Sequence, residues 1–381
     1  MDFEELHRGL QRFHNHIRRS GLRWRRGLQS STEGRVRNVV TESIEPIAHP
    51  TLADVAAIAG VSIKTASRVL NDSVNVAPDT AEKVRKAASL VGYRSNRIAR
   101  ELRGGALSNL IGMVISDLAN PFYAGLAAGA EKKLSEAGLD LIIATARDDA
   151  DRERALIDSL LERRVRGLVI VPSGEDYSYL HVERKRGYSF VFVDRPAAYL
   201  DTDTVLVDNQ GGIAVCLDEL LKQNCKKIAI IADTLNIWTA SERIEGFKRA
   251  CLSRGVDQRD IHVVTGIHTT EEAKAATHSL LGSTSRIDGI IATNDLIAMG
   301  VGEVIHQDKS AIRVVSFDDF PSAELFDIKS LDHDPQRLGR LAAEVLLKRI
   351  QNPTDTRYVT EVMKLGLHER APRTQKAAAN G

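Results

Sequence analysis

Apolar residues beyond position 109 gather in short continuous runs, and amphipathic segments separate the runs. The runs are LIGMVIS (110–116), DLIIATA (140–146), GLVIVPS (167–173), SFVFVDR (189–195), KIAIIAD (227–233), GIIATND (289–295) and IRVVSFDD (312–319). Continuous apolar strands that alternate with helices are typical of parallel sheets covered on both faces. About 270 residues of this pattern are too many for one small sheet. The pattern therefore predicts two similar α/β halves.

The segment before these runs has the period of helices instead. Three helices are expected, over 52–59, 63–70 and 78–91. Gly60 ends the first helix, Ser62 can cap the second, and Pro78 suits the first turn of the third. Two short helices joined by a tight glycine turn form a helix-turn-helix. This segment is therefore predicted to be a small all-helical unit.

The overall composition is that of a globular protein without a membrane span. Hydrophobic residues make up 43% of the chain and charged residues 27%, a balance that excludes disorder of the whole chain. No stretch approaches the roughly 18 to 20 uninterrupted apolar residues of a membrane span. Cys216, Cys225 and Cys251 lack the paired spacing of a disulfide framework or a metal site. We expect them to be reduced, buried thiols.

The net charge of the whole chain hides a local asymmetry. It is +1, from 52 basic and 51 acidic residues, which taken alone argues against binding to nucleic acid. Between residues 50 and 108, however, nine Lys and Arg oppose five Asp and Glu, a local net charge of about +4. This sign suits contact with phosphates.

Two segments beside the helical unit differ from it. Residues 1–49 hold nine arginines and no lysine, without the apolar core of a secretory signal. We expect a disordered leader, and a basic arm that contacts DNA phosphates is the alternative. Residues 96–107 could form a short helix between Asn96 and the glycines 104 and 105. Because about seven residues of helix are unstable alone in water, this segment is a candidate hinge that needs a partner to fold.

Polar and aromatic side chains follow the ends of the predicted strands. In open α/β sheets, ligands bind beyond the carboxyl ends of the strands. Carboxylates, amides and guanidiniums exchange hydrogen bonds with adjacent hydroxyls, and an aromatic face stacks on sugar C–H groups. Each residue alone is more often a cap or a turn former, but together they favour a site for a neutral polyhydroxylated ligand. The candidates are Asp117, Asn120, Phe122, Tyr123, Asp194, Arg195, Asp208, Trp238, Thr239, Arg243, Asn294 and Asp318.

Signatures of enzymes are missing from the chain. It contains no G-x-G-x-x-G after a first strand, no G-x-x-x-x-G-K-[ST] loop and no G-x-S-x-G turn. His262, His268 and His278 are scattered, and we expect them at the surface or in satisfied hydrogen bonds. Asp318 and Asp319 are adjacent, so they point apart and are a poor catalytic pair. We therefore expect no enzymatic activity, no cofactor and no metal.

The helical segment and the hinge carry a specific resemblance. The run TLADVAAIAGVSIKTASRVLNDSVNVAPDTAEKVRKAASLVGYRSNRIARELRGG (51–105) resembles the DNA-binding module and hinge of the lactose/galactose repressor (LacI/GalR) family almost without gaps. The likeness continues through NPFY, ERRVRGLVIVPS, VDRP, VDN, RIEGF, ATNDLIAMG and VVSFDD to about residue 372, roughly 85% of the chain. These later motifs are shared with periplasmic sugar-binding proteins. The leader is a departure, since most members of the family begin near residue 48.

The resemblance implies a small all-α helix-turn-helix DNA-binding domain plus an α/β core like a periplasmic binding protein, with two doubly wound parallel-sheet subdomains. The implied boundaries are 1–49 for the leader, 50–95 for the DNA-binding domain, 96–107 for the hinge helix and 108–381 for the effector-binding and dimerisation core. Within the core, the first subdomain is expected over about 108–207 plus 333–356, and the second over about 209–331 plus 357–381.

The resemblance also implies how the helical unit reads DNA. The second helix would enter the major groove, with one face turned to the domain core by Ala66, Val69 and Leu70. Ile63 and Lys64 occupy the family's specificity positions, and packing against the third helix is the alternative for Ile63. In this family the hinge folds on the operator, where Leu102 would wedge between bases. The candidate DNA contacts are Thr51, Ser62, Ile63, Lys64, Thr65, Ser67, Arg68, Asn71, Tyr93, Asn96, Arg97, Ala99 and Leu102.

The same resemblance implies the effector contacts. Phe122 would stack on the sugar, while Arg243 and Asp318 would bind hydroxyls. His333 stands where the family often has glutamine; it could donate to a hydroxyl, or to a phosphate or carboxylate if protonated. The effector is therefore expected to be a pentose, a hexose or a derivative. The positions that match those holding sugar in ribose-type binding proteins and regulators are Asn120, Phe122, Asp194, Arg195, Arg243, Asn294 and Asp318.

Together these features predict a cytoplasmic transcriptional regulator, a repressor whose affinity for double-stranded operator DNA is controlled by a small sugar in the interdomain cleft. Two hinges side by side require a homodimer, and a pseudo-palindromic operator follows from its two-fold axis. The C-terminal tail lacks leucine heptads, so we expect a dimer rather than a tetramer. Two alternatives are weaker. A periplasmic sugar-binding protein needs a signal peptide and no helix-turn-helix, and an α/β enzyme needs a nucleotide loop or an activated nucleophile.

Overall fold

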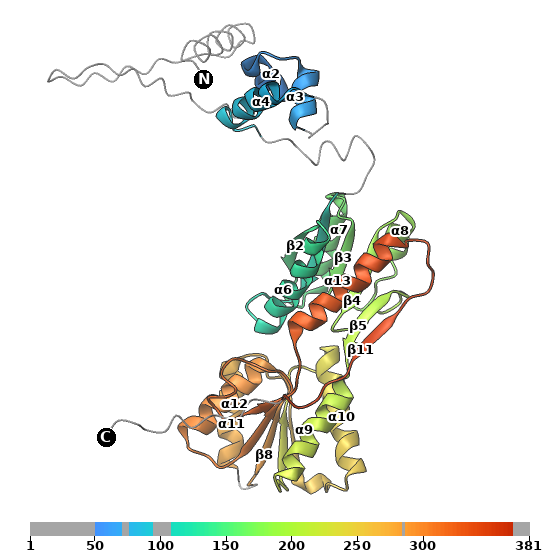
Figure 1. Cartoon of the computed structure of the whole chain (residues 1–381). Helices are drawn as coiled ribbons and strands as arrows, with labels where there is room; N and C mark the ends of the chain where they lie inside the picture. The colour runs from blue at the N-terminus through green and yellow to red at the C-terminus, as the bar shows by residue number, and fades with distance from the viewer. Residues whose placement is uncertain (1–49, 71–75, 94–107, 284–285, 369–381) are drawn as a thin grey trace, which may run out of the picture. The chain divides into compact units, whose positions relative to one another are not determined.

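The computed structural model describes residues 50–70, 76–93, 108–283 and 286–368. The chain divides into two compact units, Met1–Ala106 and Leu107–Gly381, which are considered one at a time (Figure 1). Several expectations lie outside the described residues: the leader, the C-terminal tail, the hinge, and the candidate contacts Asn71, Asn96, Arg97, Ala99 and Leu102.

The first unit contains the helices α2 (Leu52–Ala59), α3 (Ile63–Leu70) and α4 (Pro78–Leu90). Thr51 and Asp54 cap α2 reciprocally. The Asp54 amide donates to Thr51 Oγ1 at 3.3 Å, and the Thr51 amide donates to Asp54 Oδ2 at 2.8 Å. Gly60 ends the helix with a left-handed φ of 67°, a conformation that glycine adopts without a Cβ clash. The three helices expected from the sequence are confirmed.

A small apolar core holds these helices together. Val55, Ala66 and Val84 are fully buried in one cluster to which all three helices contribute. Helices of eight residues are marginal in water, so their stability comes from this shared core rather than from helix propensity.

The second unit contains two parallel sheets, as the alternating pattern predicts. Within its described residues, one sheet has six strands in the order β11-β5-β4-β3-β1-β2 and the other has five in the order β10-β9-β8-β6-β7. The strands are β1 (Leu110–Ile115), β2 (Asp140–Thr145), β3 (Gly167–Ile170), β4 (Ser189–Val193), β5 (Asp203–Val207), β6 (Ile228–Ile231), β7 (Ile261–Val264), β8 (Gly289–Ala292), β9 (Arg313–Ser316), β10 (Lys329–Ser330) and β11 (Thr360–Met363).

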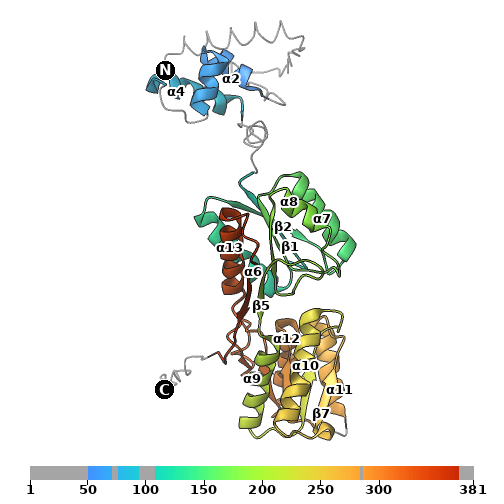
Figure 2. The same ribbon diagram turned by 90° about the vertical axis from the view of Figure 1, so that its right-hand side faces the viewer.

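Helices cover both faces of each sheet (Figures 1 and 2). The first sheet lies between the pair α6 (Pro121–Glu136) and α13 (Pro335–Gln351) and the pair α7 (Ala150–Glu162) and α8 (Leu180–Lys185). The second lies between α9 (Asn209–Lys222) with α10 (Trp238–Ser253) and α11 (Thr270–Gly282) with α12 (Asp295–Gln307); the short turn η1 (Gln258–Asp260) precedes β7. Central strands such as β3, β4, β6 and β8 are consequently buried along their whole length.

The path of the chain between the subdomains corrects one expected boundary. The chain leaves the first subdomain after β5 and returns to it at α13. Residues 357–381 were expected in the second subdomain, but β11 pairs with β5 at the edge of the first sheet, from Thr360 opposite Thr204 to Met363 opposite Val207. That part of the prediction is wrong because backbone hydrogen bonds to an open sheet edge recruit β11, whose side chains are mostly exposed.

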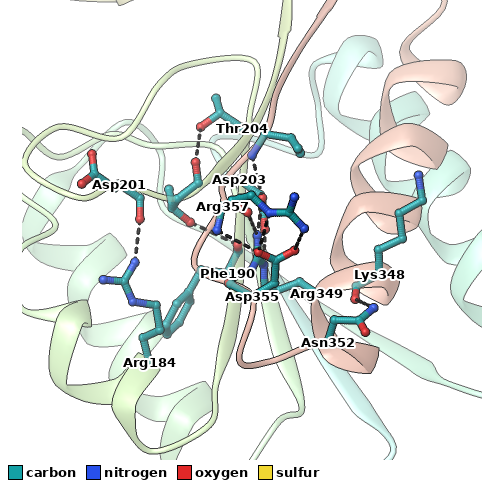
Figure 3. Close-up of polar contacts among 12 residues, drawn as sticks. Arg184, Phe190, Asp201, Asp203, Thr204, Lys348, Arg349, Asn352, Asp355 and Arg357 are labelled. Carbon is teal, nitrogen blue, oxygen red and sulfur yellow. Dashed lines mark hydrogen bonds and ion pairs between the residues drawn. The ribbon is translucent and has the colours of Figure 1, made fainter.

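A buried ion pair ties α13 to this edge (Figure 3). Arg349 donates from Nε and Nη2 to the two carboxylate oxygens of Asp203, at 2.6 and 2.9 Å. Arg349 also donates to the carbonyl oxygens of Asp355 and Arg357, and the Val359 amide donates to Asp203 Oδ1 at 3.0 Å. The bidentate geometry fixes the loop between α13 and β11, and with it the edge strand.

α6 and α13 meet backbone to backbone at two glycines. A Cβ on Gly339 would fall on the carbonyl oxygen of Leu126, and a Cβ on Gly129 would fall on the carbonyl oxygen of Gln336. This close approach fixes the position of α6, whose N-terminal turn carries Asn120 at the carboxyl end of the first sheet.

Candidate functional sites

α3 presents a polar face on the first unit. Ala66 and Val69 are buried, whereas the side chains at the start of the helix face solvent. Ile63 is 54% exposed, which contradicts the alternative that it packs against the third helix. Lys64 and Arg68 are exposed beside it. The face therefore combines two cationic donors with one apolar side chain exposed to water.

Other candidate DNA contacts also have structural roles. Ser62 Oγ accepts the Thr65 amide at 3.1 Å and contacts the Thr65 hydroxyl at 2.8 Å, so Ser62 caps α3 as expected. Thr51 caps α2. Tyr93 is half-buried against the helical core, and Ser67 is half-buried on α3.

A cleft of about 330 Å³ lies beyond the strand ends of both sheets in the second unit. This volume is at the lower end of the range for small-molecule sites, about 300 to 1,000 Å³. Of the thirteen candidate effector contacts, the structure brings ten to its lining: Asp117, Asn120, Phe122, Tyr123, Asp194, Arg195, Thr239, Arg243, Asn294 and Asp318.

Arg195 organises the first-subdomain side of the cleft. Its Nη1 donates to Asp148 Oδ1 at 2.8 Å and to the Pro172 carbonyl at 3.1 Å, and its Nη2 donates to the Tyr123 hydroxyl at 2.9 Å. Ser116 Oγ donates to the other oxygen of Asp148 at 2.5 Å. Burial opposes ionisation of Asp148, but the charge of Arg195 and these hydrogen bonds outweigh it and lower the pKa of Asp148.

Two aspartates of this lining have left-handed backbones. The φ of Asp148 is 52° and the φ of Asp194 is 70°. A residue with a Cβ persists in this region only where its surroundings hold it, and such positions gather at binding sites. Asp194 is also buried, and burial raises its pKa in spite of the adjacent Arg195.

Arg243 organises the opposite side. Its Nε donates to Asn209 Oδ1 at 2.8 Å, and its Nη1 donates to the carbonyl oxygen of Thr293. The guanidinium carbon lies 3.8 Å from the centre of the Phe317 ring, a cation–π contact. These contacts hold the guanidinium plane in place. Within the described residues they leave Nη2 available to a ligand.

A buried carboxylate pair supports this side. His333 Nδ1 and Asp318 Oδ1 are hydrogen-bonded at 2.7 Å, and the Asp295 amide donates to Asp318 Oδ2 at 3.3 Å. Burial opposes ionisation of Asp318, but His333 and Arg243 lower its pKa. Burial and the charge of Asp318 instead raise the pKa of Asp295 to about 7. Asp318 is therefore the ionised acceptor at the cleft.

Two lining amides are also helix caps. Asn120 Oδ1 accepts the Phe122 amide at 2.8 Å, and Asn294 Oδ1 accepts the Ile297 amide at 2.8 Å. Each asparagine can both cap its helix and line the cleft. Its Oδ1 accepts the hydrogen bond from its own helix, and its Nδ2 amide group is left to face the cleft.

The structure places three candidate residues outside the lining. Asp208 Oδ1 accepts the Gly211 amide at 2.8 Å and caps α9. Trp238 opens α10 half-buried, and its neighbour Ile237 lines the cleft instead. His333 is only 2% exposed and lies behind Asp318, between Phe122 and Phe317. Its contribution is to hold Asp318.

Sequence reasoning missed several lining residues. Asp148 is a partner of Arg195, and Ser116 donates a hydrogen bond to Asp148 that joins two strand ends distant in the chain. Asp233 stands at the end of an apolar run, as Asp117 does. Its position in the sequence could therefore have identified it as a candidate lining residue. His268 is exposed and hydrogen-bonded as expected, with Nδ1 3.1 Å from Asp233, but it also lines the cleft. Burial lowers the pKa of His268, and the Asp233 carboxylate more than offsets this and raises it.

The lining can bind a polyhydroxylated ligand. Ionised carboxylates accept hydrogen bonds from hydroxyls, Arg243 donates to hydroxyl oxygens, and Phe122 offers an aromatic ring. The described parts of the chain contain no group of three or more His, Cys, Asp or Glu side chains arranged to hold a metal ion. No helix among the described residues is long and apolar enough to cross a membrane.

Two family models match the chain. Residues 108–368 match the family of periplasmic binding proteins and sugar-binding domains of the LacI family. Residues 51–96 match the bacterial regulatory proteins of the lacI family.

Individual proteins resemble the chain over most of its length. The HTH-type transcriptional regulator CelR of Thermobifida fusca is 30% identical over 80% of this chain and 93% of its own length. The ribose operon repressor of Bacillus subtilis is 28% identical over 78% of this chain and 90% of its own. A crystal structure of the Lac repressor dimer bound to operator and the anti-inducer ONPF shares the fold, with a TM-score of 0.71 and 23% identity over 86% of this chain and 98% of that one. A CelR–cellobiose complex has a TM-score of 0.61 and 29% identity over 84% of this chain and 99% of that one.

Proposed function

The chain belongs to the LacI family of bacterial regulatory proteins, and from this premise we propose that it is a repressor whose affinity for operator DNA is set by a sugar bound in the cleft. The observation that carries this proposal is the solvent-facing surface of α3, where Ile63 is 54% exposed beside the exposed Lys64 and Arg68, on a chain that also holds a polar cleft. It acts in the cytoplasm, where bacterial DNA lies.

The N-terminal half of α3 reads base edges in the major groove. Lys64 and Arg68 donate to guanine O6 and N7, and Ile63 covers a thymine methyl group. A good contact of this kind discriminates against the wrong base by about 1–3 kcal/mol. Thr65 and Ser67 hold phosphates, which fixes the register of the helix on the duplex.

The cleft binds the sugar between its two arginine-centred sides. Phe122 stacks on the ring, while Arg243 and Asp318 bind neighbouring hydroxyls. A sugar is supported by the relatives, because a CelR–cellobiose complex and several ribose operon repressors resemble this chain at 28–29% identity.

The working unit is a homodimer on a pseudo-palindromic operator. One α3 of eight residues reaches only a few base pairs, so two copies about a two-fold axis read two half-sites. Hinge segments paired across the axis, with Leu102 in the minor groove, couple the cleft to DNA. Sugar and operator then change each other's affinity by the same factor. The coupling free energy that corresponds to this factor is typically about 1–3 kcal/mol. Sedimentation that shows a tetramer would contradict the dimer.

The test begins with selection of binding sites from random duplex DNA by the purified full chain. Fluorescence anisotropy on the selected duplex then measures Kd with and without sugars. We expect a two-fold related site, and Lys64→Ala should weaken binding and relax one base position, while the exposed control Lys86→Ala on α4 should not. Selection without a consensus, or an affinity that no sugar changes, would contradict the proposed function.

A further inference from the structure

The cleft carries an excess of negative charge. Its lining contains five aspartates, two arginines and one histidine. Five carboxylates against two guanidiniums and one imidazolium leave two negative charges uncompensated even when His268 is protonated. No lysine lines the cleft among the described residues.

Both guanidiniums already lie near protein carboxylates. Arg195 pairs with Asp148 at 2.8 Å and lies 3.7 Å from Asp194. Arg243 has Asp318 as its charged neighbour. The positive charge on each side is therefore already offset by a nearby carboxylate, while the guanidiniums still offer N–H donors to a ligand oxygen.

Two further aspartates occupy equivalent places in the two halves. Asp117 follows β1 in the segment SDLANPF, and Asp233 follows β6 in the segment ADTLNIW. Asp117 is exposed and accepts only the Ala119 backbone amide, at 3.0 Å, among the described residues. Asp233 accepts its neighbour's amide, and its nearest side-chain partner is the exposed His268. A ligand enclosed by both subdomains meets one of these carboxylates on each side.

We propose that Asp117 and Asp233 act as a charge filter, so that the cleft accepts polyhydroxylated molecules without negative charge and rejects phosphorylated or acidic sugars. This inference rests on the proposed function of the cleft. A hydroxyl donates to these carboxylates, whereas a phosphate or carboxylate on the ligand faces the like charge of a lining in which carboxylates outnumber cations. His333, which from the sequence could have bound an anion, is buried behind Asp318 and is not part of the cleft lining.

Matched pairs of ligands test the filter directly. Thermal unfolding of the full chain is measured with D-glucose and glucose-6-phosphate, D-ribose and ribose-5-phosphate, and D-galactose and D-galacturonate, with cellobiose added as a neutral disaccharide. A bound ligand at about 100 times its Kd should raise Tm by about 5 °C or more. We expect a shift with at least one neutral member and none with its anionic partner. A larger shift with an anionic member, or no shift with any neutral one, overturns the proposal.

Neutralising the two aspartates provides the second test. In the Asp117→Asn, Asp233→Asn double variant, the anionic partner of the neutral sugar identified above should gain about three- to tenfold in affinity relative to that sugar. Asparagine keeps the acceptor oxygen, so the neutral sugar is the internal reference. Asp151→Asn, at an exposed position on α7 away from the cleft lining, is the matched control and should leave the ratio unchanged. An unchanged ratio in the double variant overturns the filter.

Operator binding separates this inference from the proposed function. The DNA-binding assay is run on the same preparation before the ligand panel. A chain that binds no operator counts against the proposed function, whereas a chain that binds operator and responds to a phosphorylated sugar counts against the charge filter alone.

Discussion

Arg243 is the side chain whose replacement most directly tests the geometry of the cleft. Arg243→Lys keeps the positive charge but removes the planar guanidinium. Lysine cannot satisfy Asn209 Oδ1 and the Thr293 carbonyl, lie over the Phe317 ring, and present an edge to a ligand all at once. The substitution therefore separates the shape of the donor from its charge.

The expected loss of sugar affinity in Arg243→Lys follows from the hydrogen bonds that the variant loses. Nη2 and the second Nη1 hydrogen can make two charge-assisted hydrogen bonds to ligand hydroxyls, each worth about 1.5–3 kcal/mol. Loss of about 3 kcal/mol corresponds to about a hundredfold weaker sugar binding. Leaving a buried acceptor such as Asn209 Oδ1 unpaired costs about 1–3 kcal/mol of folding stability, which lowers Tm by several degrees.

The assay is calorimetric titration with the neutral sugar that gives the largest thermal shift, beside operator anisotropy. Operator affinity without sugar should stay within about threefold, because Arg243 lies in the second unit. Arg249→Lys is the control, since Arg249 lies on the same helix with a side chain that is 67% exposed. A variant that binds the sugar as tightly as the parent would refute the assignment of Arg243 as a ligand donor.

Three other substitutions test separate parts of the argument. Gly339→Ala should destabilise the second unit by about 1–3 kcal/mol or more, because the new Cβ falls on the carbonyl oxygen of Leu126. Denaturant unfolding measures this loss. Asp295→Asn should stabilise the protein relative to the parent most at about pH 8 and least at about pH 4. The midpoints of urea unfolding of the two proteins at each pH measure this difference. The folded pKa of Asp295 is raised to about 7 beside Asp318, above an unfolded value of about 3.9, so the native stability falls as the pH rises through this window. Leu102→Ala should weaken operator binding strongly while sugar binding, followed by thermal shift, stays intact.

Matched controls and contrary outcomes make these tests decisive. Gly366→Ala places a Cβ in open space, and an equal loss of stability there would show that the contact between α6 and α13 is not the cause. A stability gain in Asp295→Asn that does not change with pH would contradict the buried carboxylate pair. Unchanged operator affinity in Leu102→Ala would discard the hinge assignment.

Much of the candidate site could be predicted because its residues follow strand ends. Asn120, Asp194 and Asp318 stand at a predicted strand end or the next helix start, Arg243 lies in the second turn of the helix after a strand, and all four line the cleft. His333 could not be placed this way, because whether it faces the cleft or supports Asp318 depends on how Phe122 and Phe317 pack around it.

Local sequence alone determined the helices of the first unit and most strands of the second. Capping by Thr51 and Ser62, the left-handed Gly60 and the continuous apolar runs are effects between near neighbours in the chain, so they can be read without coordinates. The polar face of α3 follows in the same way from helical spacing.

Tertiary structure alone decided which distant residues meet. β11 joins β5 through backbone hydrogen bonds and the Asp203–Arg349 pair, neither of which leaves an apolar pattern in the sequence. Asp148 became a partner of Arg195 because a left-handed turn after β2 brings it beside the end of β4. The net charge of the cleft likewise comes from residues at the strand ends of two sheets. These residues are distant in the sequence, so the fold has to bring them together before their charges act on one ligand.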